Sequence, residues 1–320
     1  MRTKAGFWQH VEKFSRAHAL LKKGMGIVVA CSGGPDSLVL ADVLARWQPK
    51  YRLRLVIAHF EHGIRGAASR EDAAFVRSWC EEKHLPFAME AADVPRLARE
   101  AGTSVETMGR ELRYAFLERV RLERGMDVIA TAHHADDQAE TVLMHILRGT
   151  GLQGLAGIRP RRGCIIRPLL GVTKADILAY AEQAGLNPRE DVTNAVADCL
   201  RNRVRLELLP HLRQSYNPAI TRALCQLADI AADEQELALG HVPAMYLPLD
   251  CQAFRRLGTP SQRIVVRRLW QEATGSTTDL PWEAVERVRS LAVAGAGSQQ
   301  LPHHFLAQVH HGALYLTSQH

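Results

Sequence analysis

The sequence lacks several features that define common protein classes. Its six cysteines are scattered and form no Cys-x-x-Cys pair, which argues against a disulfide framework, a zinc ribbon and a typical iron–sulfur ligand set. It contains no run of about 18 apolar residues, so no membrane span is expected. Residues 1–23 form a basic, amphipathic pattern without an apolar core segment. We therefore expect no signal peptide and a cytoplasmic protein.

The Walker motif GxxxxGK[ST] is also missing from the whole chain, which disfavours a Walker-type NTPase. What is present is an ordinary globular composition over 320 residues, with 47% hydrophobic residues and a formal net charge of +6. Arginines gather between residues 148 and 213. Clustered guanidinium groups bind phosphates in a forked geometry, although a solvated charged face would give the same composition. Charge alone leaves nucleic-acid binding undecided.

Apolar strand patterns and helical patterns alternate along the first two thirds of the chain. Strands are predicted at residues 26–31, 52–60, 86–91 and 127–133, and helices at 36–47, 69–84, 105–125, 136–149, 173–185 and 200–214. Such alternation is typical of βαβ units with a parallel sheet covered on both faces. The fold class is therefore α/β, a doubly wound, mainly parallel, Rossmann-like sheet.

The breaker Asn217–Pro218 suggests a domain boundary, which we place between residues 215 and 216. Residues 1–215 would form the α/β domain, and residues 216–320 a smaller, mostly helical domain. The last residues, 304–318, are predicted to form a short hairpin, and residues 149–158 a glycine-rich loop. Residues 263–270 read either as a packing helix with a basic rim, which we favour, or as a surface that contacts a nucleic-acid backbone.

The segment SGGPDS lies between the first strand and the first helix of the sheet. Ligands of parallel sheets bind at this position, and glycines let backbone N–H groups converge on an anion at a helix N-terminus. The segment does not match GxGxxG, which disfavours a dinucleotide dehydrogenase. A simple strand–turn–helix connection, with Asp36 or Ser37 as the cap, is the alternative.

The complete hexapeptide resembles the SGGxDS loop of the N-type ATP pyrophosphatases, the PP-loop family. The resemblance implies that the loop grips the pyrophosphate of ATP and that the enzyme cleaves between the α- and β-phosphates. It assigns Asp36 to the magnesium–pyrophosphate region, because a carboxylate beside polyphosphate requires a bridging cation. The implied ATP-binding residues are Ser32, Gly33, Gly34, Pro35, Asp36, Ser37 and His59.

Three further segments resemble blocks of the tRNA(Ile)-lysidine synthetases within that family. They are HFEHGIR at residues 59–65, TAHHADDQAET with its RGTGLQGL tail at 131–155, and IIRPLL with LRNRVR at 165–205. The resemblance implies ATP-dependent adenylation of the wobble cytidine in an isoleucine tRNA with a CAU anticodon. The amine of free lysine would then displace AMP to form lysidine. ATP with Mg²⁺, lysine and that tRNA are the implied partners, without a membrane. The oligomeric state is left undecided, with a homodimer as one alternative, and the helical tail is implied to bind tRNA.

Two acids of the DDQAE block lie one helical turn apart, so they can share a face of the helix. These are Asp137 and Glu140, and they would attract the lysine ammonium and accept a proton from it. Acids at a helix N-terminus also complement the helix dipole, but this explains Glu140 poorly because the dipole effect fades after the first turn. Asp136 is explained equally well by either interpretation.

The remaining candidates are basic. The implied catalytic set is Asp36, Arg113, His133, Asp137 and Glu140, and the implied tRNA or phosphate contacts are Arg65, Arg201, Asn202 and Arg205. Arg113 has the alternative of a solvated helix arginine, and His133 that of a structural histidine. Arg201 and Arg205 lie four residues apart, on one face of a predicted helix.

Three other functions use the same kind of loop or a similar surface. A tRNA 2-thiolase would need a sulfur carrier or cluster, typically a Cys-x-x-Cys pair, which is missing. An amidotransferase-type ligase such as GMP or NAD synthetase would leave the arginine-rich middle without a role. A nucleotide-binding module that contacts tRNA without catalysis predicts ATP binding with no AMP formation.

Overall fold

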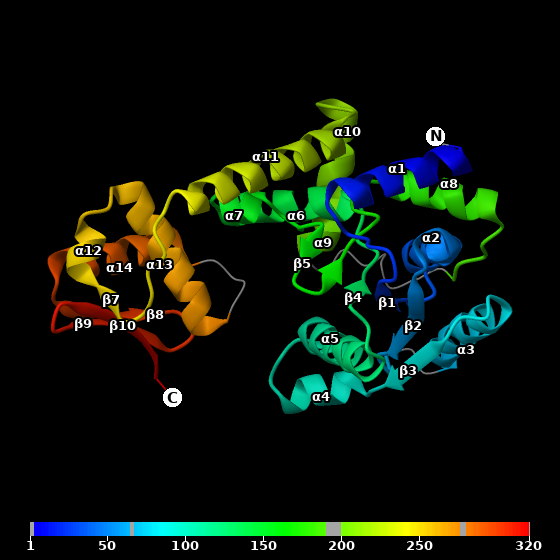
Figure 1. The fold of residues 1–320 in the computed structure, drawn as a ribbon, viewed down its shortest axis with the longest axis horizontal. Helices are drawn as coiled ribbons and strands as arrows, with labels where there is room; N and C mark the ends of the chain where they lie inside the picture. Colours follow the sequence, from blue (N-terminus) through cyan, green and yellow to red (C-terminus); the bar gives the residue numbers. More distant parts are fainter. Residues whose placement is uncertain (1–2, 65–66, 190–199, 276–279, 320) are drawn as a thin grey trace. The chain divides into compact units, whose positions relative to one another are not determined.

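The computed structural model describes residues 3–64, 67–189, 200–275 and 280–319. The chain divides into two compact units, one made of Met1–Arg148 and Gly157–Gln226 and the other of Gly149–Ala156 and Leu227–His320. Figure 1 shows the elements of both units. The predicted domain boundary between residues 215 and 216 stays a prediction.

The first unit is built on a six-stranded sheet with the order β3-β2-β1-β4-β6-β5. All neighbouring pairs are parallel except the short edge pair β5–β6. Its strands are β1 (Gly26–Ala30), β2 (Arg54–Glu61), β3 (Phe87–Ala91), β4 (Val128–Ala130), β5 (Arg161–Arg162) and β6 (Ile165–Ile166). Its helices are α1 (Lys4–Ala17), α2 (Pro35–Tyr51), α3 (Ala67–Glu82), α4 (Val94–Glu100), α5 (Val105–Glu123), α6 (Ala135–Arg148), α8 (Lys174–Ala184), α9 (Leu200–Arg203) and α10 (Leu209–Ser215), with a π-helical segment, η2 (Val204–Leu208), between the last two.

Side chains alternate between the two faces of this sheet, and each face has its own core. Ile27 and Val29 of β1 belong to the core shared with α1, α2 and α8, whereas Val28 belongs to the core shared with α4 and α5. Ile129 of β4 joins Val28 on the α5 side. The sheet is therefore covered by helices on both faces, as predicted, and α2 and α5 lie on opposite faces.

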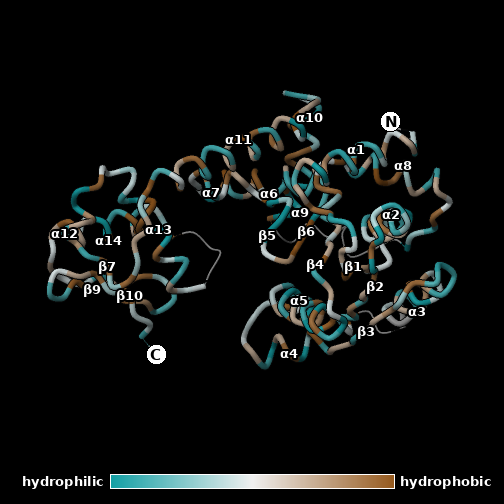
Figure 2. The backbone as a smooth tube through the Cα atoms, in the orientation of Figure 1, coloured by the Kyte–Doolittle hydropathy of each residue, from teal (hydrophilic) through white to brown (hydrophobic). Residues whose placement is uncertain are grey.

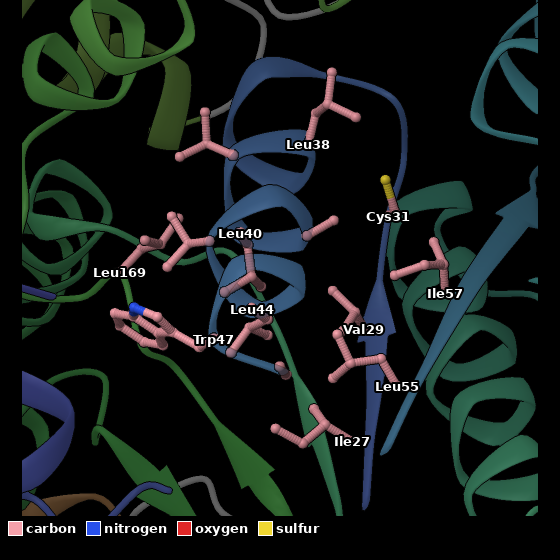
Figure 3. Packing of buried hydrophobic residues seen from close by; sticks show 14 of the residues in the cluster. Ile27, Val29, Cys31, Leu38, Leu40, Leu44, Trp47, Leu55, Ile57 and Leu169 are labelled. Atoms are coloured by element: carbon pink, nitrogen blue, oxygen red, sulfur yellow. The ribbon is translucent and has the colours of Figure 1, made fainter. Parts of the chain in front are cut away.

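Helix α2 is buried along most of its length, and Figure 3 shows how it packs. Ile27 and Val29 of β1 line one side of the helix, while Leu40 and Trp47 point away from β1 toward Leu169. Gly34 is the N-cap residue of α2 and Pro35 occupies its first turn, where a missing N–H has no cost. The first strand and this helix thus hold the predicted loop between two rigid elements.

The second unit contains a four-stranded antiparallel sheet with the order β7-β10-β9-β8. Residues of three helices and of the sheet surround a core that includes Phe254 and Trp270. Its elements are α7 (Leu152–Leu155), β7 (Leu249–Asp250), α12 (Cys251–Arg255), α13 (Thr259–Thr274), α14 (Trp282–Ala294), β8 (Gly297–Leu301), β9 (Phe305–His310) and β10 (Ala313–Ser318). Helix α11 (Ile220–Gly240) begins in the first unit and continues in the second.

The α/β fold class and the helical tail are confirmed, but three local predictions need correction. The terminal hairpin, β9–β10, is part of a larger sheet because β7 and β8 pair with its two outer edges. The glycine-rich loop at 149–158 contains one helical turn, α7. The basic helix predicted at 200–214 is interrupted by η2.

In Figure 2, the turns of α5 and α11 alternate between hydrophilic and hydrophobic colour, which fits helices that bury one face. None of the helices in the described ranges combines the length and hydrophobicity needed to cross a membrane.

Candidate functional site

The loop after β1 is organised around the buried hydroxyl of Ser37. This oxygen accepts a hydrogen bond from the Ser32 N–H and donates one to the Gly34 carbonyl, both at 3.1 Å. Gly33 has φ +89°, a conformation that favours glycine, and a Cβ there would lie 3.2 Å from Cγ2 of Val76. The two serines therefore hold the loop in shape, directly before the N-terminus of α2, where partial positive charge favours an anion.

Asp36 extends from the first turn of α2 toward two cationic or polar groups. Its Oδ1 lies 2.6 Å from Nζ of Lys174 and 3.8 Å from Nε2 of His134. Lys174 is the first residue of α8, and the capping box between Thr173 and Asp176 fixes where that helix begins. The loop aspartate is thus neutralised by a lysine that is distant in sequence.

His59 is buried against the backbone that leads into the loop. Its Nδ1 is 2.9 Å from the carbonyl oxygen of Cys31, the last residue before the loop, and its side chain is 4% exposed. Burial lowers the pKa of His59 below its ordinary value. The position suits a residue that supports the loop, and contact with pyrophosphate remains a prediction.

The two predicted acids of α6 do share one face, and both face the arginines predicted to bind phosphate. The carboxylate of Glu140 accepts hydrogen bonds from Nε of Arg201 at 2.9 Å and from Nε of Arg205 at 2.6 Å. One oxygen of Asp137 lies 3.3 Å and 3.4 Å from the same two guanidinium groups. Glu140 is 1% exposed. A compact cluster of two acids and two arginines results, which we call the carboxylate–arginine cluster.

The local fold explains how these arginines reach one carboxylate. Arg205 lies in η2, whose wider π-helical turn changes the direction of side chains relative to a regular helix. Arg201 lies in the preceding α9, with the half-buried Asn202 beside it. The hydrogen bond to Glu140 raises the pKa of Arg205. Arg205 therefore stays charged against the buried acid.

Asp137 remains ionised although its side chain is only 14% exposed. Burial raises the pKa of a carboxyl group, but the facing imidazoles of His134 and His133, the His134 N–H and Arg201 outweigh it, so the pKa of Asp137 is lowered. Asp136 has a different environment. It accepts a hydrogen bond from the Lys174 N–H at 2.8 Å, which ties α6 to α8 and favours a structural role.

His133 follows β4 and lies among groups of both signs. Its Nδ1 is 3.0 Å from the hydroxyl of Thr131. Burial lowers the pKa of His133 to about 4, opposed by Asp137 and assisted by Arg167, Arg201 and Arg113. At neutral pH this imidazole is uncharged, so it serves as a hydrogen-bonding group, not as a resident positive charge.

This low pKa predicts a pH-dependent stability. Because the native His133 binds its proton less tightly than the unfolded chain, the free energy of unfolding should fall as pH drops from about 6.5 toward 4. His62, whose burial likewise lowers its pKa to about 4, adds to this loss. We expect His133→Gln to make the decrease between pH 7 and 5 smaller by about 2 kcal/mol in urea denaturation. His211→Gln, at an exposed position, controls for loss of an imidazole, and equal slopes for the two variants would contradict the assignment.

The structure thus places the loop, Asp36, His133, Asp137 and Glu140 in one region, at the carboxyl ends of β1 and β4. Arg113 lies on α5, where its guanidinium is 5.5 Å from the ring of Tyr114. Arg65 and residues 190–199 fall outside the described residues. The predicted roles of all these residues remain predictions.

Three side chains at the site were missed by the sequence reasoning: His134, Lys174 and Arg167. His134 is 6% exposed and lies within 4 Å of Asp36, Asp136 and Asp137. Two adjacent histidines at the end of a predicted strand were the feature of the sequence that could have identified His134. Nothing near Lys174 in the sequence points to Asp36, since 138 residues separate the two.

The site offers few ligands for a metal ion. Within the described ranges, no group of three or more His, Cys, Asp or Glu is arranged to hold a metal by itself. Mg²⁺ in phosphate sites needs only one or two carboxylates besides phosphate oxygens. Asp36, which is partly exposed beside the loop, fits that smaller requirement.

Comparison with known proteins identifies the family. The model of the PP-loop domain matches residues 7–212. The tRNA(Ile)-lysidine synthase of Dehalococcoides mccartyi is 33% identical over 322 aligned residues, 94% of this chain and 68% of that protein. The chain belongs to the PP-loop family, in its tRNA(Ile)-lysidine synthase branch. The predicted family is therefore confirmed.

Other relatives in this branch align with this chain over fewer residues. The tRNA(Ile)-lysidine synthase of Symbiobacterium thermophilum is 46% identical over 231 residues, which cover 71% of this chain and 48% of that protein. The corresponding protein of Caldanaerobacter subterraneus is 35% identical over 291 residues, 88% of this chain and 62% of that one. This chain spans between about half and two thirds of the length of these relatives.

Among solved structures, the U34-tRNA thiolase NcsA from Methanococcus maripaludis, with its [4Fe-4S] cluster, has a similar fold. The TM-score is 0.57 at 20% identity, covering 76% of this chain and 82% of the thiolase. At this identity the likeness supports the PP-loop fold alone.

Proposed function

We propose that this protein ligates lysine to the wobble cytidine of an isoleucine tRNA with a CAU anticodon. ATP would adenylate the 2-keto oxygen of the base and release pyrophosphate, and the amine of lysine would then displace AMP. Relatives named tRNA(Ile)-lysidine synthase and a PP-loop domain over residues 7–212 support this activity. The partners would be ATP, free lysine and the tRNA.

One observation carries the proposal for this chain. The buried Nε2 of His134 lies 3.8 Å from Asp36 of the loop and 3.5 Å from Asp137 of α6. The nucleotide loop and the acidic face of α6 therefore meet at one imidazole. A reaction that activates a base with ATP and then brings in an amine requires these two subsites to be adjacent.

Each group then has a distinct task in the proposed reaction. The loop and the N-terminus of α2 would bind the pyrophosphate, and Mg²⁺ held at Asp36 would offset its charge. Lys174, which now pairs with Asp36, would be free to contact a phosphate oxygen once the metal occupies that carboxylate. Asp137 and Glu140 would receive the lysine ammonium and accept its proton.

The carboxylate–arginine cluster would compete with both predicted roles. While Arg201 and Arg205 bond to Glu140, part of each guanidinium faces the acid, and two cations already neutralise the carboxylate that would attract an ammonium. Phosphate and ammonium arriving together would replace these pairs without leaving a buried charge unpaired. We infer that phosphate draws the arginines away and so makes the carboxylates available to lysine.

Product analysis tests the reaction type. With ATP, Mg²⁺, lysine and the tRNA transcript, we expect AMP and pyrophosphate to form in equal amounts, and AMP release to depend on both lysine and tRNA. A thiolase would show no dependence on lysine, and the sequence lacks the Cys-x-x-Cys pair that such an enzyme typically needs. ADP as the product, or ATP binding without turnover, would contradict the proposal.

We also propose that residues 216–320 bind tRNA and that the protein is cytoplasmic. A homodimer is one alternative for its oligomeric state.

A further inference from the structure

Arg189 contacts the nucleotide loop through its backbone and α3 through its side chain. Its N–H donates a hydrogen bond of 3.1 Å to the carbonyl oxygen of Gly33. Its guanidinium pairs with two acids near the beginning of α3, with Nη2 at 2.7 Å from Glu71 and Nε at 2.8 Å from Asp72. Three segments that are distant in the sequence therefore meet at Arg189: the loop, α3 and the chain that follows α8.

Helix α3 also packs directly against the loop. A Cβ at Gly33 would lie 3.2 Å from Cγ2 of Val76 and 3.9 Å from the carbonyl oxygen of Asp72. Gly33 is thus contacted both by α3 and by Arg189, and the ion pairs join these two neighbours to each other. The Asp72 side chain is only 11% exposed, so solvent and salt screen its pair with Arg189 less than they screen a fully exposed pair.

The chain that carries Arg189 leaves α8 in a defined direction. Gly185 ends that helix in the left-handed conformation, with φ +67°. Leu186 packs against the core shared with α2, and its N–H donates to the Ala181 carbonyl at 2.9 Å. Pro188 then restricts the backbone directly before Arg189. The Arg189 N–H is therefore held at a fixed position beside the loop.

The hydrogen bond from Arg189 sets the direction of the next donor in the loop. The peptide bond between Gly33 and Gly34 is trans, so its carbonyl oxygen and its N–H point in opposite directions. Because the carbonyl points to Arg189, the Gly34 N–H points away from it, toward Oγ of the exposed Ser32 at 3.5 Å. This contact is longer than an ordinary hydrogen bond. The donor is therefore available to an anion on the accessible side of the loop.

We propose that Arg189 is a positioning residue for the pyrophosphate of ATP. Its ion pairs with α3 hold its backbone against Gly33, and that contact directs the Gly34 N–H toward the pyrophosphate. The guanidinium itself is bound to Glu71 and Asp72, so Arg189 acts through the peptide group of the loop. This inference rests on the proposed function, since it takes ATP as the ligand of the loop.

Binding of pyrophosphate and of AMP tests this role, because only pyrophosphate needs the Gly34 donor. Arg189→Ala should weaken the binding of inorganic pyrophosphate with Mg²⁺ about tenfold, the order expected for misplacing one donor to a charged group. AMP lacks the pyrophosphate group, so its affinity should change less than about twofold. Arg189→Lys keeps the charge and can pair with one acid, so it should regain most of the pyrophosphate affinity.

Arg96→Ala is the matched control. Arg96 also pairs with two acids, Asp93 and Glu100, but it lies on α4, and its loss should leave pyrophosphate binding unchanged. Asp72→Asn removes the acid of one ion pair and should weaken pyrophosphate binding by a similar factor to Arg189→Ala. Because the two side chains act as one unit, the double variant should lose no more affinity than the more affected single variant.

Unchanged pyrophosphate affinity in a folded Arg189→Ala protein, or an equal loss for AMP and pyrophosphate, would overturn the proposal. If Arg189→Ala does not fold, the Gly34 amide resonance decides, in the unsubstituted protein and in Glu71→Gln, which removes only the exposed acid. It should shift saturably with Mg²⁺ and pyrophosphate in the first protein and need more pyrophosphate in the second. A resonance that does not move, or that saturates at the same concentration in both, would contradict the proposal.

These readouts also separate the inference from the proposed reaction, because none of them depends on lysine transfer. An unsubstituted protein that binds no pyrophosphate would show that the role of the loop is wrong, and the role of Arg189 with it. Pyrophosphate binding that follows the expected order of variants, without lysine transfer, would contradict the proposed reaction alone.

Discussion

Asp36→Ala is expected to abolish turnover while leaving tRNA affinity within about threefold. Removing a charged group that positions a metal and pyrophosphate typically lowers the rate at least about 100-fold. In this chain the loss has a second consequence, because Lys174 and His134 both face Asp36. Without the carboxylate, the Lys174 ammonium would have no acidic partner at 2.6 Å and would be free to collapse onto the bound phosphates.

The measurement compares AMP formation and tRNA binding for Asp36→Ala, Asp36→Asn and a control, Glu123→Gln, which removes an exposed acid at the end of α5. Asp36→Asn keeps the shape of the side chain and should be nearly as inactive, since the charge is what the site needs. Parallel loss of tRNA binding and turnover would show that the loop is misassigned. If Asp36→Asn were nearly as active as the control, the prediction that Asp36 holds the metal would be wrong.

Glu140→Gln is expected to raise the KM for lysine at least about tenfold and the KM for ATP less than about threefold. Glu140 makes the shortest hydrogen bonds of the carboxylate–arginine cluster, to Arg201 and Arg205. The amide would lose the charge that attracts the ammonium and would leave two guanidiniums facing a neutral group. Breaking such a pair destabilises a protein by about 2 kcal/mol once solvent exposure of the arginines is considered.

Glu140→Gln removes both the charge that attracts the lysine ammonium and the partner of the two arginines. Arg205→Gln separates these two effects, because it removes one partner of Glu140 and keeps the acid. If the arginines hold Glu140 until phosphate arrives, this variant should lose the dependence of lysine affinity on ATP while still binding lysine. Glu207→Gln, an exposed acid in η2, provides the control for charge and location. An unchanged lysine dependence in Glu140→Gln would leave that residue with only the role of positioning the arginines.

The sequence was sufficient to predict four of the six strands of the sheet, the loop and the acidic face of α6, because each is encoded in a contiguous segment. Strand β1, Gly33, Gly34 and α2 follow one another, and Asp137 and Glu140 are one turn apart. The pairing of acids with Arg201 and Arg205 was not predictable, because over 60 residues separate the partners and a π-helical turn sets the direction of Arg205.

The site residues that the sequence could not identify are those whose partners come from distant elements. Lys174 reads in the sequence as an ordinary first-turn residue of α8, and only the fold brings it to Asp36. Arg167 reads as one arginine in a basic stretch, and its burial beside α5 follows from the alternation of the short β6. Composition shows how many charges a chain has, whereas burial and distance decide which of them remain unpaired.

Location of labelled lysine in the tRNA tests the central claim most directly. The full chain would be incubated with radiolabelled lysine, ATP, Mg²⁺ and the CAU-anticodon isoleucine tRNA, and the tRNA would be digested to nucleosides. We predict label in a single modified nucleoside at the wobble cytidine, and none when that base is replaced by uridine. Label that is absent, removed by mild deacylation from the 3′ end, or spread over other nucleotides would contradict the account.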